Sequence, residues 1–221
     1  MPLDRPLILR SAFAILNDSG PDSLTLRRLA KELGVQAPAI YWHFKNKQDL
    51  LDEMGTYVMR EAAEEDPAAK EALTWEEWAM EYGLGLRRTL LRYREGARMF
   101  SGTRLTDPGM YSNQDKSLRK LTGAGFSVRE AVCGMGTVYC YTIGFVIEEQ
   151  AVRPMPEEAN PSYDLGKRNE RIDQNLYPLA CAAGEVIFTD YASRFRAGLE
   201  IIVQGMARTL AAGAAPSAAA V

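Results

Sequence analysis

Apolar residues recur at helical spacing through almost the whole of this chain, and glycine or proline marks the breaks. The first stretch, LILRSAFAILND, repeats its apolar side chains one helical turn apart and stops at Gly20-Pro21. The sequence has no alternating run of β-branched residues followed by a hairpin turn. The pattern therefore predicts an all-α protein, with a compact N-terminal unit of three short helices and a larger C-terminal bundle.

Capping residues indicate where the short helices begin and end. Thr25 is an N-cap signal and Gly34 a C-terminal stop, so the second helix spans only about two turns. A third short helix begins near Ala37, with Pro38 in its first turn, where a missing N–H costs little. Asn46 then caps a fourth helix.

Two capping boxes begin the long helices of the second part of the chain, Thr74 with Glu77 and Ser127 with Glu130. The segment RPMPEEANPSYD contains three prolines and predicts a loop. Helical spacing returns in YASRFRAGLEIIVQGMARTLA. The Ala-rich tail that follows has nothing to pack against and is expected to be disordered.

Charge is unevenly distributed along the chain. The net charge is −3, yet the segment from 27 to 48 holds five basic residues against the single acid Glu32, a net charge of +4. Phosphates respond to local charge, so this basic segment keeps nucleic acid open as a partner of an acidic protein.

Several classes of protein are disfavoured by what the sequence lacks. No run approaches the roughly 20 apolar residues of a membrane span, and MPLDRPLILR has no secretory h-region, so we expect a cytoplasmic protein without a membrane partner. The only histidine, His43, excludes a His-cluster metal site. Cys133, Cys140 and Cys181 have no metal-type spacing and are expected to be small core residues.

The second and third helices, joined by a tight turn at Gly34-Val35, have the length and order of a helix-turn-helix, whose second helix enters the major groove of DNA. Ile40 can point into the core, which leaves the rim of that helix for contacts. The side chains suited to base edges are Arg27, Gln36, Ala37 and Ala39, and those suited to phosphates are Tyr41, His43 and Lys47.

The aromatic run YWHF leaves alternatives open. Phe44 fits the core, whereas Trp42 fits either the core or DNA contact. His43 fits either a structural role or DNA contact, and catalysis is disfavoured because no other feature of the sequence requires a base.

The segment LTLRRLAKELGVQAPAIYWHFKNKQDLLD resembles the DNA-binding domain of TetR-family transcriptional repressors, and residues 3 to 52 carry this resemblance. The resemblance continues beyond this DNA-binding domain, which is called the head. LLRYREGARMFSGTRL and GFSVREAVCGMGTVYCYTIGFVIEEQ resemble the effector domain of the tetracycline repressor subgroup, whereas the loop from 151 to 180 resembles it weakly.

The resemblance implies a homodimer with two heads and a four-helix interface built from segments 127–150 and 188–210 of each subunit. The glycines at 134, 136, 144, 198 and 205 fit such an interface, although they could equally serve contacts within one chain. The implied domains are a helix-turn-helix DNA-binding domain at 1–46, a connecting helix at 47–66, an effector-binding and dimerisation domain at 67–211 and a disordered tail at 212–221.

The resemblance also implies which residues touch operator DNA. Matching positions are Arg27, Pro38, Tyr41, Trp42, His43 and Lys47, and the full candidate set adds Arg28, Gln36, Ala37 and Ala39. The positions of Ala37 and Ala39 hold Gln and Thr in the tetracycline repressor, so this chain is expected to recognise a different operator.

The effector site departs further from that subgroup. The histidine that binds the drug's magnesium is matched by Phe100, and a second drug-contacting histidine by Ala63. Glu148 matches a carboxylate beside the metal, but a carboxylate without the imidazole is a poor site. We therefore expect no metal, no cofactor and no binding of magnesium-tetracycline in the manner of the subgroup.

An asparagine, a phenylalanine and a glutamine of the subgroup are replaced by Tyr82, Leu86 and Ser117. An aromatic or polycyclic effector is expected instead of the drug, because most of the candidate side chains would line an apolar cavity, with Thr103, Arg104 and Ser117 as its polar points. Without the resemblance, aromatic and Met side chains at helical spacing would more often be core. The candidate lining is Tyr82, Leu86, Phe100, Thr103, Arg104, Ser117, Val132, Met135, Tyr139 and Glu148.

These observations favour a ligand-responsive repressor that binds a palindromic operator as a homodimer and is released by its effector. The alternatives are a small-molecule-binding protein with a vestigial head, an activator with the same fold, and an all-helical enzyme. The last is disfavoured because the chain offers one imidazole and otherwise only carboxylates as a catalytic base.

Overall fold

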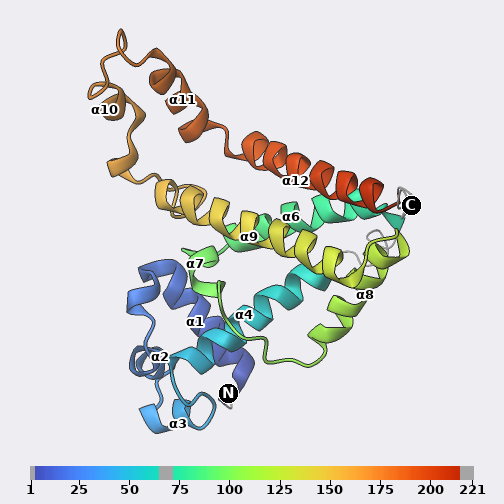
Figure 1. The fold of residues 1–221 in the computed structure, drawn as a ribbon. Helices are drawn as coiled ribbons and strands as arrows, with labels where there is room; N and C mark the ends of the chain where they lie inside the picture. Colours follow the sequence, from blue (N-terminus) through green and yellow to red (C-terminus); the bar gives the residue numbers. More distant parts are fainter. Residues whose placement is uncertain (1–2, 65–71, 215–221) are drawn as a thin grey trace.

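A computed structural model describes residues 3–64 and 72–214 of the chain (Figure 1). The described residues form helices and loops without a strand, which confirms the all-α fold class. The α-helices are α1 (Arg5–Ser19), α2 (Leu26–Glu32), α3 (Ala37–Tyr41), α4 (Lys47–Glu64), α6 (Trp75–Leu91), α7 (Gly96–Phe100), α8 (Met110–Gly123), α9 (Val128–Val152), α10 (Leu165–Asn169), α11 (Pro178–Thr189) and α12 (Tyr191–Ala214). The 3₁₀ helices are η1 (Pro21–Ser23) and η2 (Pro161–Tyr163).

Helices α1, α2 and α3 form the N-terminal unit, which lies at the foot of the molecule in Figure 1. The Thr25 side chain accepts a hydrogen bond from the N–H of Arg28 at 3.1 Å and caps α2, as predicted. The chain turns after α2 at Gly34, whose φ of 66° favours glycine. The largest fully buried side chains of this unit are Ile8, Leu16, Leu24, Leu29, Ile40 and Phe44.

Helix α4 leads from the N-terminal unit into the body. Asn46 caps it by accepting from the N–H of Asp49 at 2.8 Å, while the Asp49 carboxylate reaches back to the N–H of Lys45 at 3.1 Å. Leu50, Met54 and Val58 of α4 are buried in a cluster that extends from α1 to α9. One core therefore crosses the domain boundary that the sequence placed after residue 46, and residues 65–66 of the expected connecting helix lie outside the described residues.

The body is organised around α9, which contacts α6, α7, α8 and α12. A second core joins α6, α9 and α12, and within it Trp75 meets Phe126 edge to face with ring centroids 4.9 Å apart. The capping boxes Thr74 with Glu77 and Ser127 with Glu130 are both formed, as predicted.

The interface glycines divide into two groups. A Cβ added to Gly134 would lie within 3.0 Å of Met206, and one added to Gly198 would collide with Tyr141, so these two glycines allow α9 and α12 to approach within one chain. A Cβ at Gly136, Gly144 or Gly205 would meet no atom within 4 Å. Only this second group remains free to admit a partner subunit.

The structure contains helices that the sequence analysis did not assign, namely α8, α10 and α11. Neither α8 nor α11 has a side-chain N-cap hydrogen bond, so the local signal that located α6 and α9 is missing. Helix α12 reaches Ala214, three residues into the tail that we expected to be disordered, and 215–221 lie outside the described residues.

Helix α9 corrects one expectation. Its 25 residues include an 18-residue window of mean hydropathy 1.4, so by length and composition it could cross a membrane. We had expected no such segment. In the structure α9 packs against four other helices of the body, and 28% of that window is buried within the chain.

Candidate DNA-binding surface and effector site

The recognition helix α3 divides its side chains between core and solvent. Ile40 and Phe44 are fully buried and anchor the helix, as predicted. Trp42 is 89% exposed, so the alternative that places it in the core is wrong. The exposed rim carries Gln36, Pro38, Tyr41 and Trp42, while Ala37, Ala39 and His43 are half-buried. The exposed side chains proposed to contact DNA are therefore accessible to a partner.

The basic side chains near α3 differ in their contacts. Arg27 is exposed on α2. Arg28 instead donates to Ser19 Oγ at 2.8 Å and lies 3.6 Å from Asp18, so its guanidinium faces the end of α1. Lys47 Nζ donates to the carbonyl oxygen of Pro21 at 2.9 Å. Arg27 is therefore the best placed of the three for a base, and Arg28 has a clear structural role.

One residue of this region was missed by the sequence analysis. Arg5 of α1 donates to the carbonyl oxygen of His43 at 3.1 Å, and its guanidinium lies 5.1 Å from the centre of the Phe44 ring. Arg5 is 38 positions from His43 in the sequence. No local pattern could reveal this contact, which fastens the end of the recognition helix to α1.

The structure gathers four of the candidate effector residues in one core. Leu86 and Phe100 are buried there, and Tyr82 of α6 and Tyr139 of α9 pack against the same cluster. Tyr82 also packs against the second core, together with Met135. Burial raises the pKa of Tyr82 to about 12, with a smaller contribution from nearby Tyr139. The Tyr82 phenol therefore stays protonated at neutral pH and can donate a hydrogen bond.

The polar candidates are occupied by bonds within the chain. Thr103 donates to the Phe100 carbonyl at 2.8 Å, and Ser117 donates to the carbonyl of Asn113 at 2.8 Å. Arg104 is exposed, with its Nε 3.6 Å from a carboxylate oxygen of Asp52. Val132 and Glu148 are exposed on α9 and lie apart from the gathered aromatic residues.

The buried carboxylate of this part of α9 is the next residue, Glu149. It accepts two hydrogen bonds from Arg87 of α6, at 2.6 and 2.8 Å, and the Arg87 guanidinium lies 5.4 Å from the centre of the Phe195 ring. This pair ties α6, α9 and α12 together. Among the described residues, no three His, Cys, Asp or Glu side chains are grouped so that they could share a metal ion.

A hollow of about 420 Å³ lies where the N-terminal unit meets α7. Of the candidate effector residues it includes Thr103, so it is distinct from the aromatic core around Phe100. Its lining comes from η1, the start of α4, α7 and the following turn: Pro21, Asp22, Lys47, Gln48, Leu51, Glu95, Arg98, Met99, Ser101, Gly102 and Thr103.

Large apolar side chains form part of the exposed surface of α9, α11 and α12. They are Val128, Val132, Leu179, Val186, Ile187 and Ile201. Cys133 and Cys140 are also exposed on α9, so the expectation that they are core residues is wrong for this chain. Exposed apolar side chains mark a protein interface where they gather into one patch.

A short N-terminal helix-turn-helix with an exposed recognition helix, fused to a helical body, defines a DNA-binding regulator. The chain matches the family described as "Bacterial regulatory proteins, tetR family" over residues 8–54 and "Tetracyclin repressor-like, C-terminal domain" over residues 66–210. It belongs to the TetR family, and within it to the group with a tetracycline-repressor-like body.

Known proteins agree with this assignment. The class A tetracycline repressor protein of Escherichia coli is 38% identical over 206 residues, which cover 91% of this chain and 89% of that protein. The crystal structure of a possible TetR family regulator from Streptomyces coelicolor A3(2) has a TM-score of 0.81 at 34% identity, covering 93% of this chain and 100% of that one. A TetR variant from Acinetobacter baumannii AYE in complex with minocycline has a TM-score of 0.71 at 30% identity, covering 95% and 99% of the two chains.

Proposed function

We propose that this protein is a ligand-responsive transcriptional repressor that binds a palindromic operator as a homodimer. The observation that carries the proposal is the exposed rim of α3, with Tyr41 and Trp42 in solvent while Ile40 and Phe44 hold the helix in the core. A recognition helix must be rigid at its base and free at its rim to enter the major groove.

The proposed contacts follow from the placement of each side chain. Arg27 is exposed and can bond guanine, Gln36 can reach a base edge, and the methyl groups of Ala37 and Ala39 can meet thymine. Pro38, Tyr41, Trp42, His43 and Lys47 are assigned to the sugar–phosphate backbone and its flanks. Lys47 keeps two further N–H groups for a phosphate while it bonds to Pro21.

The apolar surface of α9, α11 and α12 supports the homodimer. Cys133, Cys140, Gly136 and Gly205 lie exposed on these helices, and burial against a second copy would cover them. A two-fold symmetric dimer would place its recognition helices about 34 to 36 Å apart, in successive major grooves.

The effector is proposed to be a small aromatic or polycyclic molecule that enters beside Tyr82, Leu86, Phe100 and Tyr139. These residues form an apolar environment with a neutral phenol donor, which suits a flat ligand bearing a hydrogen-bond acceptor. The minocycline complex of the A. baumannii relative supports a polycyclic ligand in this fold. Phe100 supplies no metal ligand, so the proposed mode of binding is independent of magnesium.

Release from DNA requires the effector to prefer a different spacing of the heads. To lower the DNA-binding-competent fraction of the protein from 99% to 1%, the effector must bind the other conformation about 10⁴-fold more tightly. The proposed lever is α7, which contacts α4 and α9 and carries Phe100 at its end. Because α4 shares one core with α1, a displacement of α7 would carry the whole head with it.

A gel-shift assay on the DNA upstream of the protein's own gene tests this function. We expect Arg27→Ala to weaken binding about fivefold or more, since a good base contact is worth about 1 to 3 kcal/mol. Tyr41→Ala should also weaken binding, because it removes a backbone contact that positions α3 on the DNA. Arg119→Ala, an exposed arginine on α8 paired with Asp115, is the matched control and should bind normally. Unchanged binding by both head variants would refute the assigned surface.

A further inference from the structure

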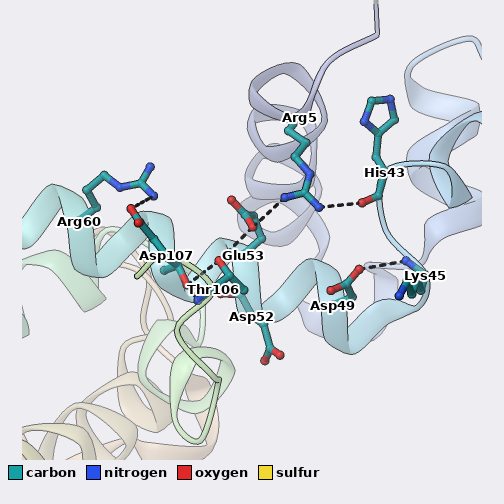
Figure 2. A network of polar contacts seen from close by, with 10 residues as sticks. Arg5, His43, Lys45, Asp49, Asp52, Glu53, Arg60, Thr106 and Asp107 are labelled. Atoms are coloured by element: carbon teal, nitrogen blue, oxygen red, sulfur yellow. Dashed lines mark hydrogen bonds and ion pairs between the residues drawn. The ribbon is translucent and has the colours of Figure 1, made fainter. Parts of the chain in front are cut away.

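Glu53 of α4 lies at the meeting point of two parts of the molecule (Figure 2). One of its carboxylate oxygens, Oε2, accepts a hydrogen bond from Arg5 Nη1 of α1 at 3.3 Å. The same oxygen accepts from the hydroxyl of Thr106 at 3.0 Å. Arg5 belongs to the DNA-binding head, whereas Thr106 belongs to the loop that follows α7 in the body.

Within the DNA-binding head, Arg5 also contacts the end of the recognition helix. Its other terminal nitrogen donates to the carbonyl oxygen of His43 at 3.1 Å, and its guanidinium packs over the ring of Phe44. The N–H of His43 in turn bonds to the carbonyl of Ile40 in α3. A shift of Arg5 would therefore act directly on the last turn of the recognition helix, next to Trp42.

On the body side, the loop 104–107 lies along α4 (Figure 2). The N–H of Arg104 donates to Asp52 at 3.1 Å, and the N–H of Thr106 donates to Thr56 Oγ1 at 2.8 Å. The Thr106 hydroxyl has two acceptors in reach, Glu53 Oε2 at 3.0 Å and Thr56 Oγ1 at 3.1 Å. The ionised carboxylate is the stronger acceptor and takes the proton, while the Thr56 hydroxyl donates to the Asp52 carbonyl. The loop is thus attached to α4 by several bonds over more than one helical turn.

A second attachment of this loop provides a comparison. Arg60 of α4 pairs with Asp107 at 2.7 Å. Arg60 lies about two helical turns after Glu53 along α4 and farther from α1. This pair holds the same loop to the same helix, and Asp107, the partner of Arg60, lies in the body. Glu53 differs because its carboxylate also pairs with α1.

We infer that Glu53 is a positioning residue, which couples the loop after α7 to the recognition helix through Arg5. The inference rests on the proposed DNA-binding function and adds a route within it. When α7 moves, loop 104–107 moves with it, and loss of the Thr106 bond changes how Glu53 holds Arg5 and so how α3 is presented to DNA.

The expected change in operator affinity follows from the solvent exposure of Glu53 and Arg5. The Glu53 side chain is 17% exposed and that of Arg5 is 52% exposed, so solvent screens the pair. Interactions of this kind change an equilibrium by a modest factor, and we expect about a threefold loss of operator affinity for each single variant.

A double-mutant cycle tests whether the two bonds act through Glu53. Arg5→Met and Thr106→Val should each weaken operator binding about threefold, and the double variant should also weaken it about threefold rather than about ninefold. In a Glu53→Ala background Thr106→Val should have no further effect, whereas Arg5→Met still removes the bond to the His43 carbonyl. Independent, multiplying losses would overturn the inference.

Fluorine NMR of protein labelled with 5-fluorotryptophan provides a readout that does not depend on DNA. The chain has three tryptophans, and Trp42→Phe identifies the resonance of Trp42. Thr106→Val should shift that resonance, Thr106→Ser should restore it because it keeps the hydroxyl, and Arg60→Met should leave it in place.

These outcomes separate two failures. If wild-type protein binds no operator but the Trp42 resonance responds to Thr106→Val, the proposed function fails and the coupling stands. If operator binding is sequence-specific but the resonance is unmoved by Thr106→Val, or moves as much with Arg60→Met, the coupling through Glu53 is wrong.

Discussion

The buried ion pair between Arg87 and Glu149 gives the most quantitative prediction for the body. The two side chains are 14% and 8% exposed and share hydrogen bonds of 2.6 and 2.8 Å. Removing one partner leaves the other charge buried without its counterion. That change typically costs about 3 to 5 kcal/mol, whereas replacing both by apolar residues of similar volume is often nearly neutral.

We therefore expect Glu149→Ala to lower the free energy of unfolding by about 3 to 4 kcal/mol. With a urea dependence of roughly 2 to 3 kcal/mol per M, the unfolding midpoint should fall by about 1 to 2 M. The double variant Arg87→Met with Glu149→Leu should recover most of this loss, because both new side chains are uncharged and the methionine can still pack against the ring of Phe195.

Urea denaturation followed by circular dichroism measures both variants at one protein concentration, since a dimer's stability depends on concentration. The reasoning is refuted if Glu149→Ala unfolds within about 0.5 kcal/mol of the wild type, because the site would then be well solvated. It is also refuted if the double variant is as unstable as the sum of two single losses.

Two further predictions concern the head and the effector site. Phe44→Ala should lower the free energy of unfolding by about 3 to 5 kcal/mol, since the ring is fully buried, whereas Trp42→Ala should change it by less than about 0.5 kcal/mol while weakening operator binding. Equal thermal shifts for both would show that Trp42 is part of the core. Isothermal titration with tetracycline should give no tight, magnesium-dependent binding, because the apolar Phe100 offers the metal no ligand; a strong magnesium-dependent signal would contradict the proposed site.

The parts of the fold that sequence could predict are those with local signals. Thr25, Thr74 and Ser127 are N-cap residues with a side-chain bond to their own helix, and each was found from a few neighbouring letters. Helix α8 follows Gly109, and α11 follows Tyr177, neither of which makes a side-chain cap, so both helices escaped notice.

The parts of the fold and of the site that the sequence could not predict depend on contacts between distant parts of the chain. Arg87 and Glu149 are 62 positions apart and Arg5 and Glu53 are 48 apart, so no spacing rule connects them. The expectation that Cys133 and Cys140 are core residues was also wrong. An apolar residue on α9 can face the core of its own chain or the apolar surface outside it, and the sequence pattern is the same in both cases.

Hydroxyl-radical footprinting on the DNA upstream of the protein's own gene tests the central claim most directly. The account predicts two protected half-sites related by two-fold symmetry, with centres about one helical turn apart, and loss of both with Tyr41→Ala. A footprint that lacks symmetry, or one that Tyr41→Ala leaves intact, would contradict the claim that a dimer reads DNA through α3.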